Sequence, residues 1–208
     1  MVMKLKALMV LFLFAFFITP TYAAKPTPPP TISNLVCLDP GHGGTDSGAR
    51  NQDLTEKAVN LDVALLLESK LLKAGFTVAM TRRDNDTTLT NADRYNFCNS
   101  NKAAILVSIH HNGATATNVD YTTALYMKKT DLRLANVVAE TVSSQLGLTN
   151  NQTSRFASGV LLKAKMPATI SEGFFLTNSA EYDAIKTGNR LDQEAGALLL
   201  AIQTYLAN

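Results

Sequence analysis

The chain has 208 residues, no tryptophan and only two cysteines, Cys37 and Cys98. Small domains that are held together by disulfides carry four or more cysteines, so this chain depends on a packed apolar core instead. Because Cys37 lies in an apolar strand-like run and Cys98 in a helical stretch, we expect two separate buried thiols. A disulfide is the alternative if that helix packs beside that strand.

The chain also lacks an excess of charge of one sign. It carries 19 Lys and Arg residues against 17 Asp and Glu residues, without any block of basic residues. A protein that binds nucleic acid usually presents a basic face, so we expect no nucleic-acid partner. The length leaves room for one domain with a full core and not for a second.

The longest apolar run lies at the N-terminus and is too short to span a bilayer comfortably. Two lysines precede apolar residues 7–18, and small residues follow at 21–24. This order predicts a secretory signal peptide over residues 1–23, with an uncleaved anchor as the alternative. Residues 24–33 are proline-rich and predict an extended linker, which leaves 34–208 as the folded domain. We expect a secreted or periplasmic protein with no membrane contact after cleavage.

Strands and helices are predicted to alternate along this domain. The strands are expected at 34–38, 76–81, 103–110, 124–127, 160–164 and 168–172, the helices at 54–75, 90–98, 130–145 and 191–206, and a polar loop at 150–158. Such alternation is typical of an α/β domain built on a mostly parallel twisted sheet, with helices on both faces.

Four polar residues lie where such sheets collect ligands, at the carboxyl ends of strands. His42 follows the first strand among glycines, His110 and Glu172 each end a strand, and Glu56 begins the long helix. Two imidazoles and a carboxylate form a zinc set, and the second carboxylate is left to act on water. Taken singly, each histidine is also compatible with a surface or core residue, and Glu56 with a favourable first-turn acid. Glu172 stands apart because a carboxylate in an apolar strand is costly to bury without a partner.

Adjacent strand residues point to opposite faces, so His111 cannot easily bind the same ion as His110. We expect the His111 side chain to face solvent, with a contact to substrate as the alternative. Other chemistries fit the sequence poorly. The glycine-rich stretch 43–48 lacks the Lys-Ser/Thr that follows a phosphate loop, and no G-x-S-x-G motif occurs. Cys37 and Cys98 lie within regular elements, away from the ends where a nucleophile would be expected.

Four ordered motifs decide among these interpretations. They are LDPGHGG at 38–44, EK at 56–57, SIHHN at 108–112 and PATISEGFFLTN at 167–178. Together they resemble the zinc-dependent N-acetylmuramoyl-L-alanine amidases of bacterial cell walls, the type 3 family, over residues 34–207. The resemblance implies that zinc is held by His42, Glu56 and His110, with Glu172 as the catalytic carboxylate.

The resemblance also implies the reaction, which is hydrolysis of the amide between N-acetylmuramic acid and the L-Ala of peptidoglycan stem peptides. His111 and Ser171 depart from the family's usual residues, but the four matched positions are intact. A zinc peptidase that cuts within the stem peptide, and a non-catalytic wall-binding homologue, remain as alternatives.

Some relatives carry a long helical insertion that plugs the zinc site until a partner removes it. Between Asn112 and Ser171 this sequence predicts only a strand, a helix, a polar loop and another strand. We therefore expect an enzyme that needs no activator protein. We also expect a monomer.

Overall fold

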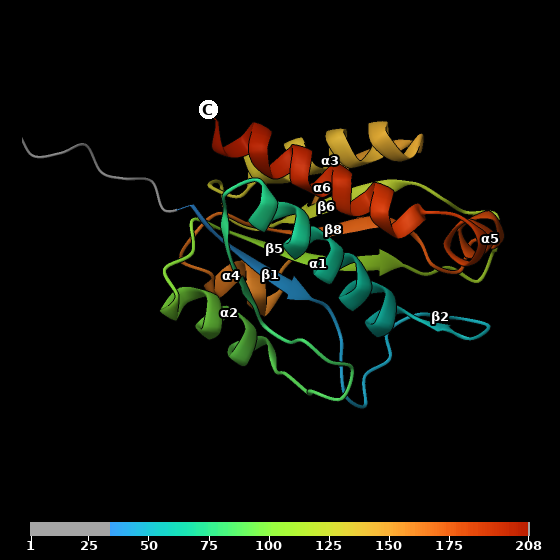
Figure 1. Ribbon diagram of the computed structural model, residues 1–208, viewed down its shortest axis with the longest axis horizontal. Coiled ribbons are helices and arrows are strands. Elements are labelled where there is room, and N and C mark those ends of the chain that lie inside the picture. Colours follow the sequence, from blue (N-terminus) through green and yellow to red (C-terminus); the bar gives the residue numbers. More distant parts are fainter. Residues whose placement is uncertain (1–33, 208) are drawn as a thin grey trace, which may run out of the picture. The chain divides into compact units, whose positions relative to one another are not determined.

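The computed structural model describes residues 34–207 (Figure 1). The expected signal peptide, 1–23, and the expected linker, 24–33, lie outside the described residues and stay predictions. None of the helices in the described part has the length and apolar character needed to cross a membrane.

A six-stranded sheet with strand order β4-β1-β5-β8-β6-β7 forms the centre of the domain. Its strands are β1 (Leu35–Pro40), β4 (Thr77–Met80), β5 (Ile105–Asn112), β6 (Thr122–Tyr126), β7 (Asn150–Arg155) and β8 (Ala168–Phe175). The first four strands in this order are mutually parallel, and β6 runs antiparallel to β8 with β7 parallel beside it. The predicted α/β fold with a mostly parallel sheet is confirmed.

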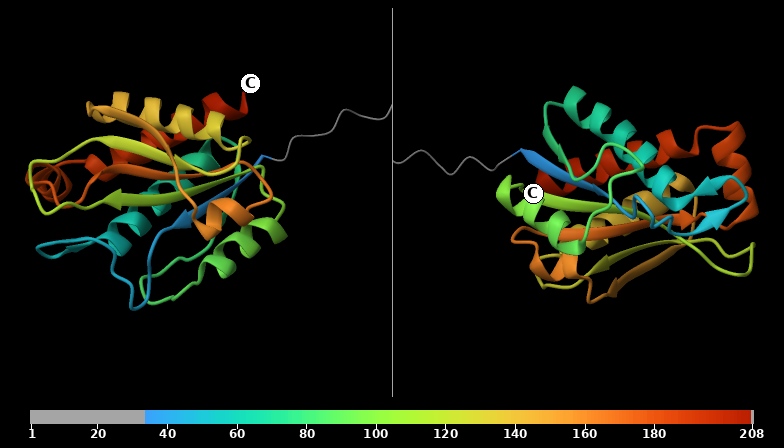
Figure 2. Two further views of the ribbon diagram at one scale, coloured as in Figure 1. Left: turned by 180° about the vertical axis from the view of Figure 1, so that it is seen from behind. Right: turned by 90° about the horizontal axis from the view of Figure 1, so that it is seen from below.

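Helices cover both faces of the sheet, as predicted (Figures 1 and 2). One face carries α1 (Glu56–Lys73), α3 (Leu132–Leu146) and α6 (Arg190–Leu206), and the other carries α2 (Asn91–Ser100) and α4 (Gly159–Lys163). Because strand side chains alternate between the faces, neighbouring residues enter different cores. Val36 and Leu38 belong to the larger core under α1, α3 and α6, whereas Cys37 belongs to the smaller core under α2 and α4.

Several elements differ from the sequence predictions. The strand predicted at 160–164 is wrong, because this region forms helix α4 up to Lys163. The Ser158 side chain accepts a hydrogen bond from Val160 N and starts the helical turn. The predicted polar loop at 150–158 contains β7, a polar edge strand without the alternation of apolar residues that predicts strands. The short helix α5 (Ser179–Thr187) and the two-residue strands β2 (Arg50–Asn51) and β3 (Leu54–Thr55) were not predicted.

The expectation of two separate thiols is also wrong, because Cys37 and Cys98 form a disulfide. Helix α2 packs against the face of β1 that carries Cys37, and the two Cα atoms lie 5.7 Å apart, within the usual distance for a disulfide. The bridge joins residues 61 positions apart and links α2 covalently to the central sheet.

Candidate functional site

The side chains of His42, Glu56 and His110 meet at the carboxyl ends of β1 and β5, beside the start of α1. His42 lies just beyond β1, Glu56 is the first residue of α1, and His110 lies near the end of β5. One ligand atom from each residue lies within 4.8 Å of the others. Among residues 34–207, these three His and Glu side chains are the group close enough together to hold a metal ion.

The buried Glu56 carboxylate is the centre of this cluster. Its Oε1 lies 3.0 Å from His42 Nε2 and 3.0 Å from His110 Nδ1. Backbone N–H groups hold the carboxylate in place, from His111 to Oε1 at 3.1 Å and from Ala49 to Oε2 at 2.9 Å. Burial would raise the pKa of Glu56, but hydrogen bonds from His110 and His42 outweigh it and hold the pKa well below its usual range. An ionised carboxylate between two imidazoles is a ligand set that suits zinc.

His42 adopts a left-handed backbone conformation, with φ of 59°, which is uncommon for a residue with a side chain. Its Nδ1 lies 2.8 Å from Asp46 Oδ2, and its Nε2 faces Glu56. Burial would lower the pKa of His42, but its bonds to Glu56 and Asp46 outweigh that effect and raise it. A carboxylate on the outer nitrogen fixes the tautomer and orientation of a ligating imidazole. Asp46 was not predicted as a site residue.

Two glycines leave room for the cluster. A Cβ atom at Gly41 would overlap the ring of His110, and a Cβ atom at Gly48 would overlap the carboxylate of Glu56. Gly48 also has a φ of +62°, which favours glycine. The glycine-rich stretch therefore serves the close approach of these side chains.

Glu172 of β8 is the register partner of His110 in β5, so its side chain leaves the sheet next to the cluster. Burial raises the pKa of Glu172, and the charge of Glu56 adds to this against the opposing effect of His110. A buried carboxyl with a raised pKa is typical of a group that accepts and returns a proton. All four residues singled out in the sequence thus lie at one edge of the sheet.

A cleft of about 370 Å³ opens beside the cluster, on the face covered by α2 and α4. Its lining includes His42, His110, Ser108, Arg94 and the segment 156–160. Phe156 is 52% exposed, so an aromatic ring borders the cleft.

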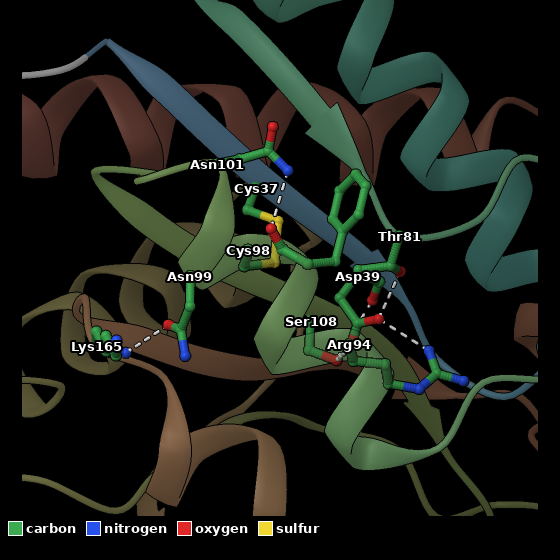
Figure 3. The surroundings of a disulfide bond; sticks show 10 residues. Cys37, Asp39, Thr81, Arg94, Cys98, Asn99, Asn101, Ser108 and Lys165 are labelled. Atoms are coloured by element: carbon green, nitrogen blue, oxygen red, sulfur yellow. Dashed lines mark hydrogen bonds and ion pairs between the residues drawn. A yellow bond between two sulfur atoms is a disulfide. The ribbon is translucent and has the colours of Figure 1, made fainter.

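A buried network centred on Asp39 joins β1 to α2 (Figure 3) and forms part of the wall of the cleft. Asp39 Oδ1 accepts hydrogen bonds from Arg94 Nη1 at 2.8 Å and Thr81 Oγ1 at 2.7 Å, and Oδ2 accepts one from Ser108 Oγ at 2.7 Å. Burial would raise the pKa of Asp39, but the Arg94 charge and these bonds outweigh it and lower the pKa. We did not predict this network, although an Asp in an apolar strand is the same signal that singled out Glu172.

The prediction that His111 faces solvent is wrong. Its side chain is fully buried, with Nε2 2.8 Å from Glu194 Oε2 and Nδ1 2.7 Å from Asn60 Oδ1. His110 and His111 do project to opposite faces, but the second face is covered by α1 and α6. Burial would lower the pKa of His111, but the charge of Glu194 outweighs it and raises the pKa.

Residues 36–204 match the family described as N-acetylmuramoyl-L-alanine amidase. The chain belongs to this family. The resemblance read from the four sequence motifs is thereby confirmed.

Individual amidases agree with the family match. LytC of Bacillus subtilis, an N-acetylmuramoyl-L-alanine amidase, is 31% identical over 173 residues, which is 81% of this chain and 35% of LytC. The crystal structure of an N-acetylmuramoyl-L-alanine amidase from Clostridium difficile 630 superposes with a TM-score of 0.79 at 31% identity, covering 86% of this chain and 99% of that one. The CwlD amidase of Clostridioides difficile, solved in complex with the GerS lipoprotein, has a TM-score of 0.72 at 27% identity, covering 83% and 98%. The chain thus spans about a third of LytC but nearly all of these two solved amidase chains.

Proposed function

We propose that this chain is a zinc-dependent hydrolase of the amide bond between N-acetylmuramic acid and the L-Ala of peptidoglycan stem peptides. The observation that supports this most directly is the convergence of His42, Glu56 and His110, with Glu172 beside them, in a domain of the amidase family. The two imidazoles and one carboxylate would be the zinc ligands, and Glu172 the catalytic carboxylate.

The residues present fit zinc by their chemistry. Nitrogen and carboxylate oxygen donors suit this borderline ion, and three protein ligands leave a position for water or substrate. The Asp46 carboxylate on His42 Nδ1 is the kind of outer partner that ligating histidines usually have. Zinc at this site would supply a Lewis acid for the amide carbonyl and would lower the pKa of a water to about 7.

Glu172 would then carry out the proton transfers of the reaction. Its raised pKa suits a group that accepts a proton from the attacking water and returns it to the departing amine nitrogen. The neighbouring cleft, lined by Arg94, Ser108 and the segment 156–160, would hold the substrate across the cluster. This arrangement serves hydrolysis of a single amide bond and needs no further cofactor.

The proposed partner is peptidoglycan, and the proposed location is the cell envelope, as a secreted or periplasmic protein. LytC and the C. difficile enzyme carry the amidase name, and the Staphylococcus relatives are named probable cell wall amidases. We further propose a monomer that acts without an activator, although CwlD was solved with the GerS lipoprotein bound.

Digestion of purified peptidoglycan, followed by mass spectrometry of the released fragments, tests this function. We expect free stem peptides that begin with L-Ala, beside glycan chains with bare lactyl groups. Fragments cut inside the stem peptide, with the muramyl-L-Ala bond whole, would instead show a zinc peptidase. Absence of any released fragment from a zinc-loaded protein would favour a non-catalytic wall-binding homologue.

A further inference from the structure

The guanidinium of Arg94 holds the segment that carries His42. Its Nη1 donates to Asp39 Oδ1 at 2.8 Å and to the Pro40 carbonyl at 2.9 Å, and its Nη2 donates to the His42 carbonyl at 2.8 Å. The Arg94 side chain is only 8% exposed, so these bonds are largely shielded from water. The planar fork of an arginine can reach three acceptors in fixed directions, which a lysine cannot do.

The bond to the His42 carbonyl falls where the backbone most needs support. His42 has a φ of 59°, a conformation that persists in a residue with a side chain only when the surroundings hold it. A fixed carbonyl fixes the peptide group that follows His42 and so helps to set the direction of the Cα–Cβ bond that carries its ring. Arg82 also donates to this segment, but to the carbonyls of Pro40 and Gly41 and not to that of His42.

The disulfide lies on the same two surfaces as the Arg94–Asp39 ion pair (Figure 3). Cys37 precedes Asp39 by two residues on β1, so both side chains leave the same face of the sheet. Cys98 follows Arg94 by four residues on α2, so both lie on the same side of the helix. Two links, one covalent and one ionic, therefore fix the position of α2 along β1.

We propose that Arg94 is a positioning residue for His42, and that the Cys37–Cys98 disulfide fixes the helix that presents Arg94. The inference rests on the proposed zinc site, because it assigns Arg94 the task of holding one ligand ready for the ion. Loss of the arginine geometry lets the His42 peptide relax, which weakens zinc binding more than it weakens the fold.

The test compares Arg94→Lys with Thr81→Val as a matched control. Arg94→Lys keeps a positive charge beside Asp39 but cannot reach all three acceptors, whereas Thr81→Val removes a 2.7 Å bond to the same carboxylate and leaves the His42 carbonyl bond in place. Zinc dissociation constants are measured by competition with a chromophoric chelator, and thermal midpoints are measured on metal-free protein. The visible spectrum of the cobalt-substituted protein reports the ligand geometry.

We expect Arg94→Lys to raise the zinc dissociation constant about 10- to 100-fold, the usual effect of losing an outer partner of a metal ligand, and to change the cobalt spectrum. Thr81→Val should lower the thermal midpoint and leave both metal readouts at wild-type values. Wild-type zinc affinity in Arg94→Lys would overturn the inference, as would an equal loss of affinity in Thr81→Val. A wild-type protein that binds no zinc would overturn the proposed function as well, so the two failures are distinguishable.

The disulfide is tested with Cys37→Ala and Cys98→Ala combined, which leaves the buried charges untouched. A dithiol reductant is avoided because it would itself bind zinc. We expect this variant to lose zinc affinity in the same direction as Arg94→Lys, and to add little further loss when the changes are combined, because both act through the same contact. Fully additive losses, or no loss in the paired cysteine variant, would overturn the role of the disulfide.

Discussion

His111 and Glu194 form an ion pair in the interior of the domain, with Nε2 and Oε2 2.8 Å apart and neither side chain exposed. Asn60 Nδ2 donates to the Gly41 carbonyl, so Asn60 Oδ1 faces His111 Nδ1 as an acceptor. Both ring nitrogens of His111 therefore face acceptors, an arrangement that favours the doubly protonated, positively charged imidazole. The pair connects α6, through β5 and α1, to the back of the candidate metal cluster.

We expect His111→Ala to lower the free energy of unfolding by about 3–5 kcal/mol, because it leaves the Glu194 charge buried and unpaired. The folded variant should still bind zinc, since His111 contributes only its backbone N–H to Glu56. Urea unfolding and zinc analysis measure the two effects. Asp192→Asn is the control. The partly exposed Lys70–Asp192 pair also joins α1 to α6, and its loss should lower the free energy of unfolding by less than about 1 kcal/mol. Near wild-type stability of His111→Ala would show that the pair is not ionised.

The fold could be predicted from the sequence wherever strands are apolar and helices are long. The central strands β1, β5 and β8 are buried on both faces, and β1 and β5 begin with continuous apolar runs. The failures concern elements that are polar or short. Strand β7 is polar and exposed, and the apolar residues of α4 resemble a strand because a five-residue helix is too short to show a period.

Within the candidate site, the sequence predicts those residues that are unusual in their local sequence. His42 among glycines and Glu172 in an apolar strand stand out in this way. The buried groups around the site could not be predicted. Arg94 donates to the His42 carbonyl and Glu194 pairs with His111, but both lie on helices, where charged residues are ordinary. Their burial follows only from how α2 and α6 pack on the sheet, which no local pattern reports.

Zinc content is expected to be about one ion per chain, because three ligands of borderline type converge at one point. A chelator should abolish hydrolysis, and added zinc should restore it. His42→Ala combined with His110→Ala should remove the metal, as measured by elemental analysis after dialysis. Full activity in a verified metal-free sample would contradict the proposed ligand set. Stoichiometric zinc in the variant that combines His42→Ala and His110→Ala would contradict it as well.

The free energy of unfolding at acidic pH should depend on the Asp39 carboxylate. Because its pKa in the folded protein is lowered from 3.8, its ionised form stabilises the fold above that pH, and this contribution is lost as the pH falls further. Asp39→Asn should cost about 3–5 kcal/mol at neutral pH, since the Arg94 charge stays buried, and should flatten the acid end of the stability curve. Unfolding curves between acidic and neutral pH measure this. Asp53→Asn, at the exposed Lys186 pair, is the control and should change little.

We expect the domain alone to hydrolyse peptidoglycan without an added partner. The connection from β5 to β8 contains β6, α3, β7 and α4 and no element beyond these, and the cleft beside the cluster is open. Release of dye from labelled peptidoglycan by the purified domain measures this activity. Strict dependence on a second protein would contradict the expectation and would direct attention to the segment 156–160 as a gate.

Substitution of Glu172 should have a different effect from substitution of a proposed zinc ligand. Loss of a ligand empties the metal site, whereas loss of a proton acceptor leaves the metal in place and slows the reaction. Glu172→Gln keeps the shape of the side chain, so zinc content should stay at the wild-type value while kcat falls by a factor on the order of 10² to 10⁴. Thermal stability should be equal or slightly higher, because burial raises the pKa of Glu172 and the substitution removes a charge that is costly to bury. Glu56→Gln is the matched comparison and should lose zinc. Normal turnover by Glu172→Gln would refute its catalytic role. If Glu172→Gln loses zinc and Glu56→Gln keeps it, Glu172 is the ligand and Glu56 is the catalytic carboxylate.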